Sequence, residues 1–225
     1  MRIGIIGAMQ IEVDALTAEL KSAKTEKISG IIFNIGRIGS SDVVVAECGI
    51  GKVNAAICTQ TMIFKYAPDY IINVGVAGGL APELDLSGMV LASAVCQHDF
   101  DTSGSPFGDP PGLIPNLGGV NISCSTDFNE KLLELEPGLL VGVVASGDQF
   151  VASAGEGEYI AKNFGAIALD MESAAIGHAC YVNQVPFLIL RAISDKADGD
   201  ASEEYGGNVE KAALAPIKLI LGLLK

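Results

Sequence analysis

Short runs of consecutive apolar residues alternate along the chain with segments of helical periodicity, and this alternation constrains the fold more than any other feature. The runs predicted as strands lie at 3–6, 43–47, 70–74, 89–95, 140–145, 166–169 and 187–191. The segments predicted as helices lie at 11–21, 53–66, 129–136, 156–163, 172–182 and 209–224. Strands that are apolar on both faces need cover on both faces. We therefore predict an α/β fold, a three-layer αβα arrangement around a central mixed, largely parallel sheet.

Nothing in the sequence divides the chain, so residues 1–225 are expected to form a single domain with one ample core. The one long irregular stretch, 97–123, is rich in glycine and proline. A loop of that length in a compact domain is expected to serve the site or a subunit contact. Pro216 lies near the start of the last apolar stretch and is expected to kink or restart the final helix.

The chain is both acidic and strongly apolar. Its formal net charge is −13, whereas phosphate binding needs clustered Lys and Arg, so no nucleic-acid partner is expected. No apolar run is long enough to span a membrane, and the first predicted strand begins at residue 3, so neither a membrane span nor a signal peptide is expected. The five cysteines form no CxxC pair and fall mostly in apolar segments, as expected of reduced core thiols in a cytoplasmic protein.

Chemically useful residues follow several of the predicted strands, and ligands of α/β sheets bind beyond the carboxyl ends of strands. The segments concerned are 7–12 with Glu12, the small-residue run 75–79, 169–173 with Asp170 and Glu172, and 191–200 with Arg191 and Asp195. A carboxylate kept out of water at such an edge, as Asp195 would be, has a raised pKa and can act as an acid.

Each of these acids also has a purely structural explanation. Glu12 and Glu172 would each lie in the first turn of a helix, where the helix dipole favours a carboxylate. Asp170 would serve as a helix cap, and Asp195 as a cap or a turn residue. The acids of 195–200 resemble a calcium loop only loosely, because the closing bidentate glutamate is missing. From the residues alone both interpretations stay open, and no metal site is expected.

Other catalytic arrangements have little support in this sequence. The chain has two histidines, His98 and His178, and lacks the GxSxG and HExxH motifs of hydrolase triads and zinc sites. It also lacks GxxxxGK[ST], and its opening glycines make no GxGxxG fingerprint. No cofactor is therefore expected.

Six segments, spread in order over nearly the whole chain, are specific when taken together. They read IGIIGAMQIEV (3–13), CGIGKVNAA (48–56), INVGVAGGL (72–80), SGDQFV (146–151), LDMESAAI (169–176) and RAISDKAD (191–198). This ordered set resembles the 5′-methylthioadenosine/S-adenosylhomocysteine nucleosidase family, a branch of the nucleoside phosphorylase fold. The resemblance implies an N-glycosidic hydrolase that releases adenine from these nucleosides, leaving 5-methylthioribose or S-ribosylhomocysteine, in methionine salvage and methyl-cycle recycling.

The resemblance also implies the roles of two carboxylates. Asp195 would protonate N7 of the adenine as the general acid, and Glu12 would hold and activate the attacking water. Two carboxylates on opposite sides of a glycosidic bond follow the logic of an inverting glycosidase. Positioned proton transfer accelerates a reaction by about 10²–10⁴-fold, or roughly 3–5 kcal/mol of barrier.

Further positions carried over from the family would surround the substrate. Phe150 would stack on the adenine, the Val151 main chain would read its exchangeable edge, and Glu172 would accept hydrogen bonds from the ribose hydroxyls. The remaining positions are Ala77 and Gly78 beneath base and sugar, Met171 against the sugar, Arg191 and Ser194 orienting the catalytic carboxylates, and Ile50 and Tyr205 at the 5′-alkylthio group. The family forms dimers, so we expect a homodimer in which the Phe107 loop completes the partner's pocket.

Two positions depart from the family pattern, since Val76 stands where serine is common and Asp170 where glutamate is. They leave the reaction class intact and the substrate preference open. A phosphorylase of this fold would need cationic groups around phosphate, including an Arg where this chain reads 73–75, NVG, so water is the expected nucleophile. A futalosine-like substrate stays open, whereas a non-catalytic binding protein is disfavoured because Glu12 and Asp195 are both present.

Overall fold

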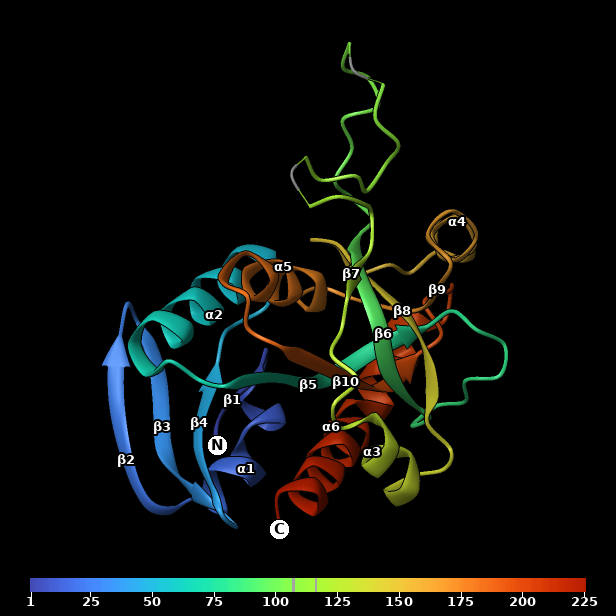
Figure 1. Ribbon diagram of the computed structural model, residues 1–225. Helices are drawn as coiled ribbons and strands as arrows, with labels where there is room; N and C mark the ends of the chain where they lie inside the picture. Colours follow the sequence, from blue (N-terminus) through green and yellow to red (C-terminus); the bar gives the residue numbers. More distant parts are fainter. Residues whose placement is uncertain (107, 116) are drawn as a thin grey trace.

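The computed structural model describes residues 1–106, 108–115 and 117–225, and Figure 1 shows their arrangement. The elements follow in the order β1 (Arg2–Gly7), the 3₁₀ turn η1 (Gln10–Glu12), α1 (Asp14–Ala18), β2 (Lys21–Ile28), β3 (Ile31–Ile38), β4 (Ser41–Glu47), α2 (Lys52–Tyr66), β5 (Tyr70–Gly79), β6 (Met89–Gln97), β7 (Ile122–Ser123), α3 (Asn129–Leu135), β8 (Leu140–Ser146), α4 (Ala154–Phe164), β9 (Ala166–Asp170), α5 (Ser173–Asn183), β10 (Phe187–Asp195) and α6 (Ala201–Leu224).

The ten strands of the described chain belong to one mixed sheet, in the order β10-β6-β8-β9-β5-β1-β4-β3-β2, with β7 paired to β6. β1 pairs in parallel with both β4 and β5, and β2 and β3 extend that side in antiparallel fashion. β5 pairs with β9 and with β10 as well, and β10 pairs back onto β6. The sheet thereby closes on itself through β5, β10, β6, β8 and β9. The sequence pattern does not predict this closure.

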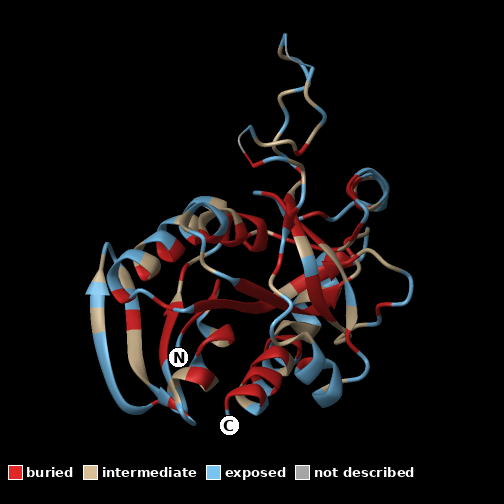
Figure 2. Cartoon of the chain, viewed as in Figure 1, coloured by how far each residue is buried: buried red, intermediate tan, exposed pale blue. Residues whose placement is uncertain are grey.

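Alternate residues of the central strands face two separate cores, as the apolar runs predict. Ile3 and Ile5 of β1 pack toward α1, α3 and α6, whereas Ile6 packs toward α2 and α5. A third, smaller core lies between α4 and the strands β6, β8 and β9. Figure 2 shows the buried residues concentrated in the sheet and on the inward faces of these helices. The mixed sheet with helices on both faces therefore confirms the predicted fold class.

The predicted helix at 11–21 is wrong. The chain forms η1 and the short α1 there, and β2 already begins at Lys21. The sequence pattern also misses the β2–β3 hairpin, because β2 reads KSAKTEKI and is exposed along most of its length. The local signal for this hairpin is the pair Ser29-Gly30, whose residues both have positive φ in the turn.

The final helix starts at Ala201, earlier than predicted, and passes through Pro216 without interruption. Pro216 lies on the buried face of α6, so apolar packing holds the helix together where one amide hydrogen is missing. The stretch between β6 and β7 is irregular as predicted, and its described residues extend away from the body of the molecule in Figure 1. Phe107, named above for the partner's pocket, lies outside the described residues.

All five cysteines are buried and unpaired, as predicted for core thiols. No helix among the residues that the structure describes is long and apolar enough to cross a membrane.

Candidate active site

A cavity of about 300 Å³ lies at the carboxyl ends of β1, β5, β9 and β10. The predicted positions that line it are Glu12, Ile50, Ala77, Gly78, Phe150, Val151, Met171, Glu172, Ser194, Asp195 and Tyr205. The other lining residues are Ala8, Met9, Val76, Gln149, Leu169 and Asp170. Arg191 does not line the cavity but lies fully buried behind its wall. The structure therefore gathers the residues singled out in the sequence around one cavity.

Glu12 is held at the end of η1 by main-chain amides. Its Oε2 accepts hydrogen bonds from the N–H of Ala8 at 2.6 Å and of Met9 at 3.0 Å, and its Oε1 accepts from the N–H of Val76 at 3.1 Å. Burial raises the pKa of Glu12, although the charge of Arg191 and these three amides oppose the shift. A carboxyl group so placed can take up a proton at a higher pH than an exposed glutamate can.

Asp195 ends β10 on another wall of the same cavity. Its Oδ2 accepts a hydrogen bond from Ser194 Oγ at 2.8 Å, and its Oδ1 accepts from the N–H of Ala197 at 3.0 Å. Burial raises the pKa of Asp195 against the effect of these two hydrogen bonds. Space for the carboxyl group depends on Gly78, because a Cβ there would lie 3.1 Å from Asp195 Oδ1.

The two acids contact neighbouring positions of β5. Glu12 accepts from the amide of Val76, and Asp195 lies against Gly78, two residues further along the strand. Two residues of a strand span about 7 Å. The main-chain positions that the two acids contact are therefore about 7 Å apart along β5.

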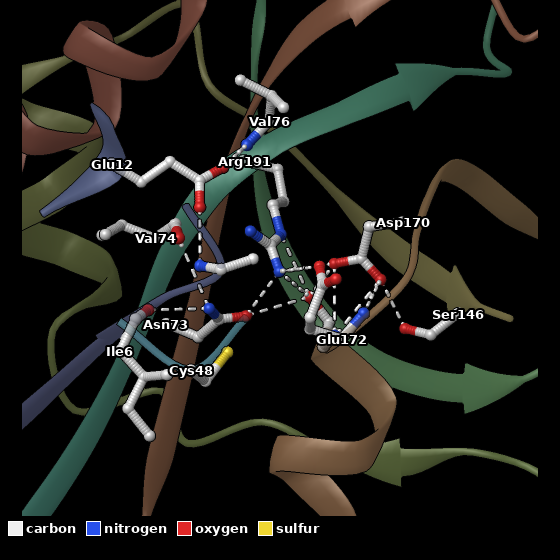
Figure 3. Close-up of polar contacts among 12 residues, drawn as sticks. Ile6, Glu12, Cys48, Asn73, Val74, Val76, Ser146, Asp170, Glu172 and Arg191 are labelled. Carbon is white, nitrogen blue, oxygen red and sulfur yellow. Dashed lines mark hydrogen bonds and ion pairs between the residues drawn. The ribbon is translucent and has the colours of Figure 1, made fainter. Parts of the chain in front are cut away.

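Arg191 is the centre of a buried ionic cluster behind the cavity (Figure 3). Its Nη2 lies 2.6 Å from Asp170 Oδ2 and 3.8 Å from Glu172 Oε2. No hydrogen bond links Arg191 to Glu12 or Asp195 in the described part of the chain. Arg191 still acts on Glu12 through its charge.

The second guanidinium nitrogen of Arg191, Nη1, is buried and has no hydrogen-bond partner among the described residues. A Cβ added at Gly75 would lie 1.9 Å from this nitrogen and 2.7 Å from Glu12 Oε1. The two atoms therefore lie close to each other over the main chain of Gly75, where no side chain fits. A donor on one side and an acceptor on the other suit a water molecule or a hydroxyl group.

Asp170 and Glu172 share the strand-to-helix turn between β9 and α5. Asp170 Oδ1 accepts from the amides of Glu172 at 3.3 Å and Ser173 at 3.2 Å, so Asp170 holds the turn ahead of α5, whose N-cap residue is Glu172, and it also pairs with Arg191. Glu172 Oε1 accepts from the N–H of Gly51 at 2.9 Å. Burial is the larger cause that raises the pKa of Glu172, and the negative charge of Asp170 raises it further.

Asn73 is a part of this site that sequence reasoning misses. It is fully buried in β5, where its Oδ1 accepts from Arg191 Nη2 at 2.6 Å and its Nδ2 donates to the carbonyl of Ile6 at 2.8 Å. Ser173 Oγ also donates to Asn73 Oδ1 at 3.2 Å. The available signal was a single amide side chain within an otherwise apolar strand, since such a residue needs buried partners.

Aromatic side chains close the remaining side of the cavity. The rings of Phe150 and Tyr205 meet edge to face with centroids 5.5 Å apart, and Tyr205 Oη lies 3.3 Å from Met9 Sδ. Of the other apolar side chains that line the cavity, Val151 is buried and Ile50 is exposed. This side offers flat apolar surface together with one phenolic hydroxyl. Across the described residues, no group of three or more His, Cys, Asp or Glu side chains could hold a metal ion.

Two buried acids on different walls of one largely apolar cavity define a site for proton transfer to and from a small molecule. The family model of the phosphorylase superfamily matches residues 2–225. A 5′-methylthioadenosine/S-adenosylhomocysteine nucleosidase of Tolumonas auensis is 36% identical over 232 residues, which cover 100% of this chain and 99% of that protein.

Solved structures of relatives agree with this match. An S-adenosylhomocysteine nucleosidase from Streptococcus pyogenes, in complex with 5-methylthiotubericidin, has a TM-score of 0.94 and 30% identity, covering 100% of this chain and 96% of that one. A futalosine hydrolase mutant of Helicobacter pylori has a TM-score of 0.92 and 32% identity, covering 98% and 96%. The chain belongs to the 5′-methylthioadenosine/S-adenosylhomocysteine nucleosidase family of the phosphorylase superfamily.

Proposed function

We propose that this chain hydrolyses the N-glycosidic bond of 5′-methylthioadenosine and S-adenosylhomocysteine, releasing adenine and 5-methylthioribose or S-ribosylhomocysteine. The observation that carries the proposal is the pair Glu12 and Asp195, both buried at one cavity and both with raised pKa values. Full-length identity of 36% to a nucleosidase of this specificity supports the same reaction.

Asp195 is the proposed general acid. Cleavage of the bond leaves negative charge on the adenine, and a proton delivered to its N7 makes the base a better leaving group. Because burial raises the pKa of Asp195, the group keeps its proton to a higher pH than an exposed aspartate does. The hydrogen bond from Ser194 to Oδ2 and that from the Ala197 amide to Oδ1 fix the orientation of the carboxyl group.

Glu12 is the proposed acceptor of the water proton. Its Oε1 and the unpartnered Arg191 Nη1 lie close to each other over Gly75, and a water held by both would donate to the carboxylate and accept from the guanidinium. The negative charge of Glu12 also stabilises the cationic sugar that forms as the bond breaks. Val76 contributes its amide to Glu12 and no side-chain hydroxyl, so the water is held by fewer groups than a serine there would allow.

The other cavity residues are proposed to bind the nucleoside. Phe150 stacks on the adenine, and the Val151 main chain reads its edge. Glu172, held by the Gly51 amide, accepts from the ribose hydroxyls while Met171 packs against the sugar. The remaining assignments are Ala77 and Gly78 beneath base and sugar, Ser194 and Arg191 as supports of the acids, and Ile50 and Tyr205 at the 5′ group.

The cavity favours water over phosphate as nucleophile. None of its lining residues is a lysine or an arginine, and the Arg191 guanidinium behind the wall is already ion-paired with Asp170 and faces Glu172. A phosphate dianion beside Glu12 and Glu172 would be repelled. Hydrolysis therefore fits the described residues better than phosphorolysis does.

A futalosine-like nucleoside is a second candidate substrate. The observation in its favour is the close match to the Helicobacter pylori futalosine hydrolase structure, with a TM-score of 0.92 and 32% identity. The Tyr205 hydroxyl, whose partner is the weakly accepting Met9 sulfur, could serve a polar 5′ group as readily as its ring serves an alkylthio group. Relative kcat/KM values decide between the two candidates.

A cytoplasmic homodimer is proposed as the working form. α2 and α5 lie side by side and leave large apolar side chains exposed, namely Val53, Ile57 and Phe64 on α2 and Tyr181 and Val182 on α5. Exposed apolar side chains gathered on one face are typical of a subunit contact. Five buried, unpaired cysteines are typical of a reducing compartment.

The test is release of free adenine by purified protein in phosphate-free buffer. We expect turnover of methylthioadenosine without phosphate, and kcat/KM values measured for S-adenosylhomocysteine, 5′-deoxyadenosine, adenosine, inosine and futalosine rank the substrates. Glu12→Gln, purified in the same way, controls for contaminating host enzymes and should release adenine at least about a hundredfold more slowly. A strict requirement for phosphate would contradict hydrolysis.

A further inference from the structure

Lys52 begins α2 and places a cation where a helix disfavours one, at the positive end of the helix dipole. Its ammonium Nζ lies 2.5 Å from Asp99 Oδ1 and 3.2 Å from Gln97 Oε1, at the end of β6. The Lys52 side chain is 16% exposed and that of Asp99 25%. The ion pair is therefore partly shielded from water, and no part of the mechanism proposed above uses it.

The contacts around this pair form a closed ring of three residues. Lys52 Nζ donates to Asp99 Oδ1, the Asp148 amide donates to Asp99 Oδ2 at 2.9 Å, and the Lys52 amide donates to Asp148 Oδ1 at 2.7 Å. Burial alone would raise the pKa of Asp99, but the Lys52 and Asp148 hydrogen bonds outweigh it and hold the pKa below its ordinary value. Asp99 is thus a charged acceptor at neutral pH.

The ring joins parts of the fold that the sheet keeps apart. Asp99 follows β6 and Asp148 follows β8, and these two strands are neighbours in the sheet. Lys52 follows β4, which lies on the far side of β1. Between β8 and β4 the sheet order interposes β9, β5 and β1. The two contacts made by Lys52, with Asp99 and with Asp148, connect loops whose strands are not paired, whereas the Asp148–Asp99 contact joins the loops that follow the paired strands β6 and β8.

Both ends of the proposed nucleoside site depend on these loops. Asp148 precedes Phe150 and Val151 by two and three residues, and these are the residues that line the apolar end of the cavity. Gly51, adjacent to Lys52, donates its amide to Glu172 at 2.9 Å. A shift of the Lys52 main chain would therefore move the partner of Glu172 and the anchor of the 148–151 segment together.

We infer that Lys52 is a positioning residue that, through its ring with Asp99 and Asp148, holds the base-facing segment 148–151 and the ribose-facing Glu172 in one fixed relative geometry. The kinetic consequence rests on the proposed function, whereas the structural consequence does not. Neither catalytic acid belongs to the ring. Its loss should therefore weaken nucleoside binding much more than it slows bond cleavage.

A merely local role is the alternative. A partly exposed ion pair often contributes little to stability, and its removal would then lower the melting temperature slightly and leave binding and segment 146–152 unchanged. The two possibilities are separated by Lys52→Met, which keeps the aliphatic stem and removes the charge. Lys52→Arg keeps the charge, and Lys211→Met removes an exposed lysine of α6 as a matched control.

The experiment measures amide hydrogen exchange of the ligand-free protein and steady-state kinetics on methylthioadenosine. For Lys52→Met we expect exchange of 146–152 to be faster by about tenfold, KM to rise by at least about fivefold, and kcat to change by less than about threefold. Lys52→Arg, which keeps the charge, should show nearly the exchange rate and the KM of the wild type. Lys211→Met should match the wild type in both. Asp99→Asn, which leaves the lysine in place, should reproduce Lys52→Met, and the double variant should be no worse than either single one.

Unchanged exchange in 146–152 in both Lys52→Met and Asp99→Asn would overturn the inference. A fall in kcat with unchanged KM would also overturn it, because the ring would then act on the acids rather than on binding. If the wild type released no adenine, the proposed function would fail. The exchange measurement would still decide whether the ring holds the segment.

Discussion

Replacing Asp195 by asparagine removes the acidic proton and preserves the shape of the side chain. The new carbonyl oxygen can accept from the Ala197 amide, which lies 3.0 Å from Oδ1 in the native protein. The new NH₂ group can donate to Ser194 Oγ, 2.8 Å from Oδ2, while the Ser194 hydroxyl turns to the carbonyl of Ala77 at 3.4 Å. Because each polar atom keeps a partner, we expect Asp195→Asn to fold normally.

The expected effects on activity and stability differ in sign. Loss of a positioned general acid costs about 10²–10⁴ in rate, or roughly 3–5 kcal/mol of barrier. Burial raises the pKa of Asp195 in the folded state, so its ionised form costs stability once the pH exceeds the ordinary value of 3.8. Asparagine carries no such cost. The stability of Asp195→Asn relative to wild type should therefore increase as the pH rises from about 4 through the raised pKa.

The assay combines initial rates of adenine release at saturating methylthioadenosine with calorimetric unfolding at pH 4 and pH 8. We expect kcat to fall at least about a hundredfold, substrate affinity to stay within about fivefold, and the melting temperature to match or exceed that of wild type at pH 8. Asp198→Asn, three residues along and outside the cavity lining, is the matched control and should retain near-normal turnover. A folded Asp195→Asn enzyme with kcat within tenfold of wild type would refute the assignment of the acid.

Three further changes test other parts of the reasoning. Ser194→Ala removes a hydrogen bond that lowers the pKa of the proposed acid, so the alkaline limb of the kcat/KM profile should move to higher pH, and an unmoved limb would contradict this role. Gly75→Ala places a methyl group 1.9 Å from Arg191 Nη1, so calorimetry should show a loss of about 1–3 kcal/mol in the free energy of unfolding. The rate of adenine release should fall at least about tenfold, and normal turnover would exclude a water site above this glycine. Val182→Asp places a charge on the exposed α5 surface and should yield monomers by light scattering, while Val141→Asp on β8 should not; equal behaviour of the two would contradict the proposed contact.

The sequence predicts the central strands well because strands buried on both faces consist of consecutive apolar residues. β10 is apolar through most of its length, and all nine of its residues are buried. β2 shows the limit of this signal, since an exposed edge strand needs no apolar residues and reads as polar chain. The helix predicted at 11–21 fails for a related reason, because periodicity cannot tell a single turn from a full helix.

The proposed catalytic pair could be named from the sequence only through resemblance to a family. On residues alone, Glu12 had an equally good explanation as a helix-dipole partner, and in the structure its carboxyl oxygens do accept main-chain amides at η1. Asn73 and the free Nη1 of Arg191 belong to the same site, but their roles depend on neighbours far away in the sequence. No local pattern predicts such neighbours.

The sequence by itself determined the alternation of strands and helices, the absence of known nucleotide and metal motifs, and the ordered segments that mark the family. These are local properties, set by side-chain chemistry over a few consecutive residues. Only the tertiary structure decided that the sheet closes through β5 and β10, that Asp195 meets Gly78 and Glu12 meets Val76, and that Lys52 links three loops. Pairing and burial in a packed core depend on which distant segments compete for the same space, and a linear pattern does not contain that information.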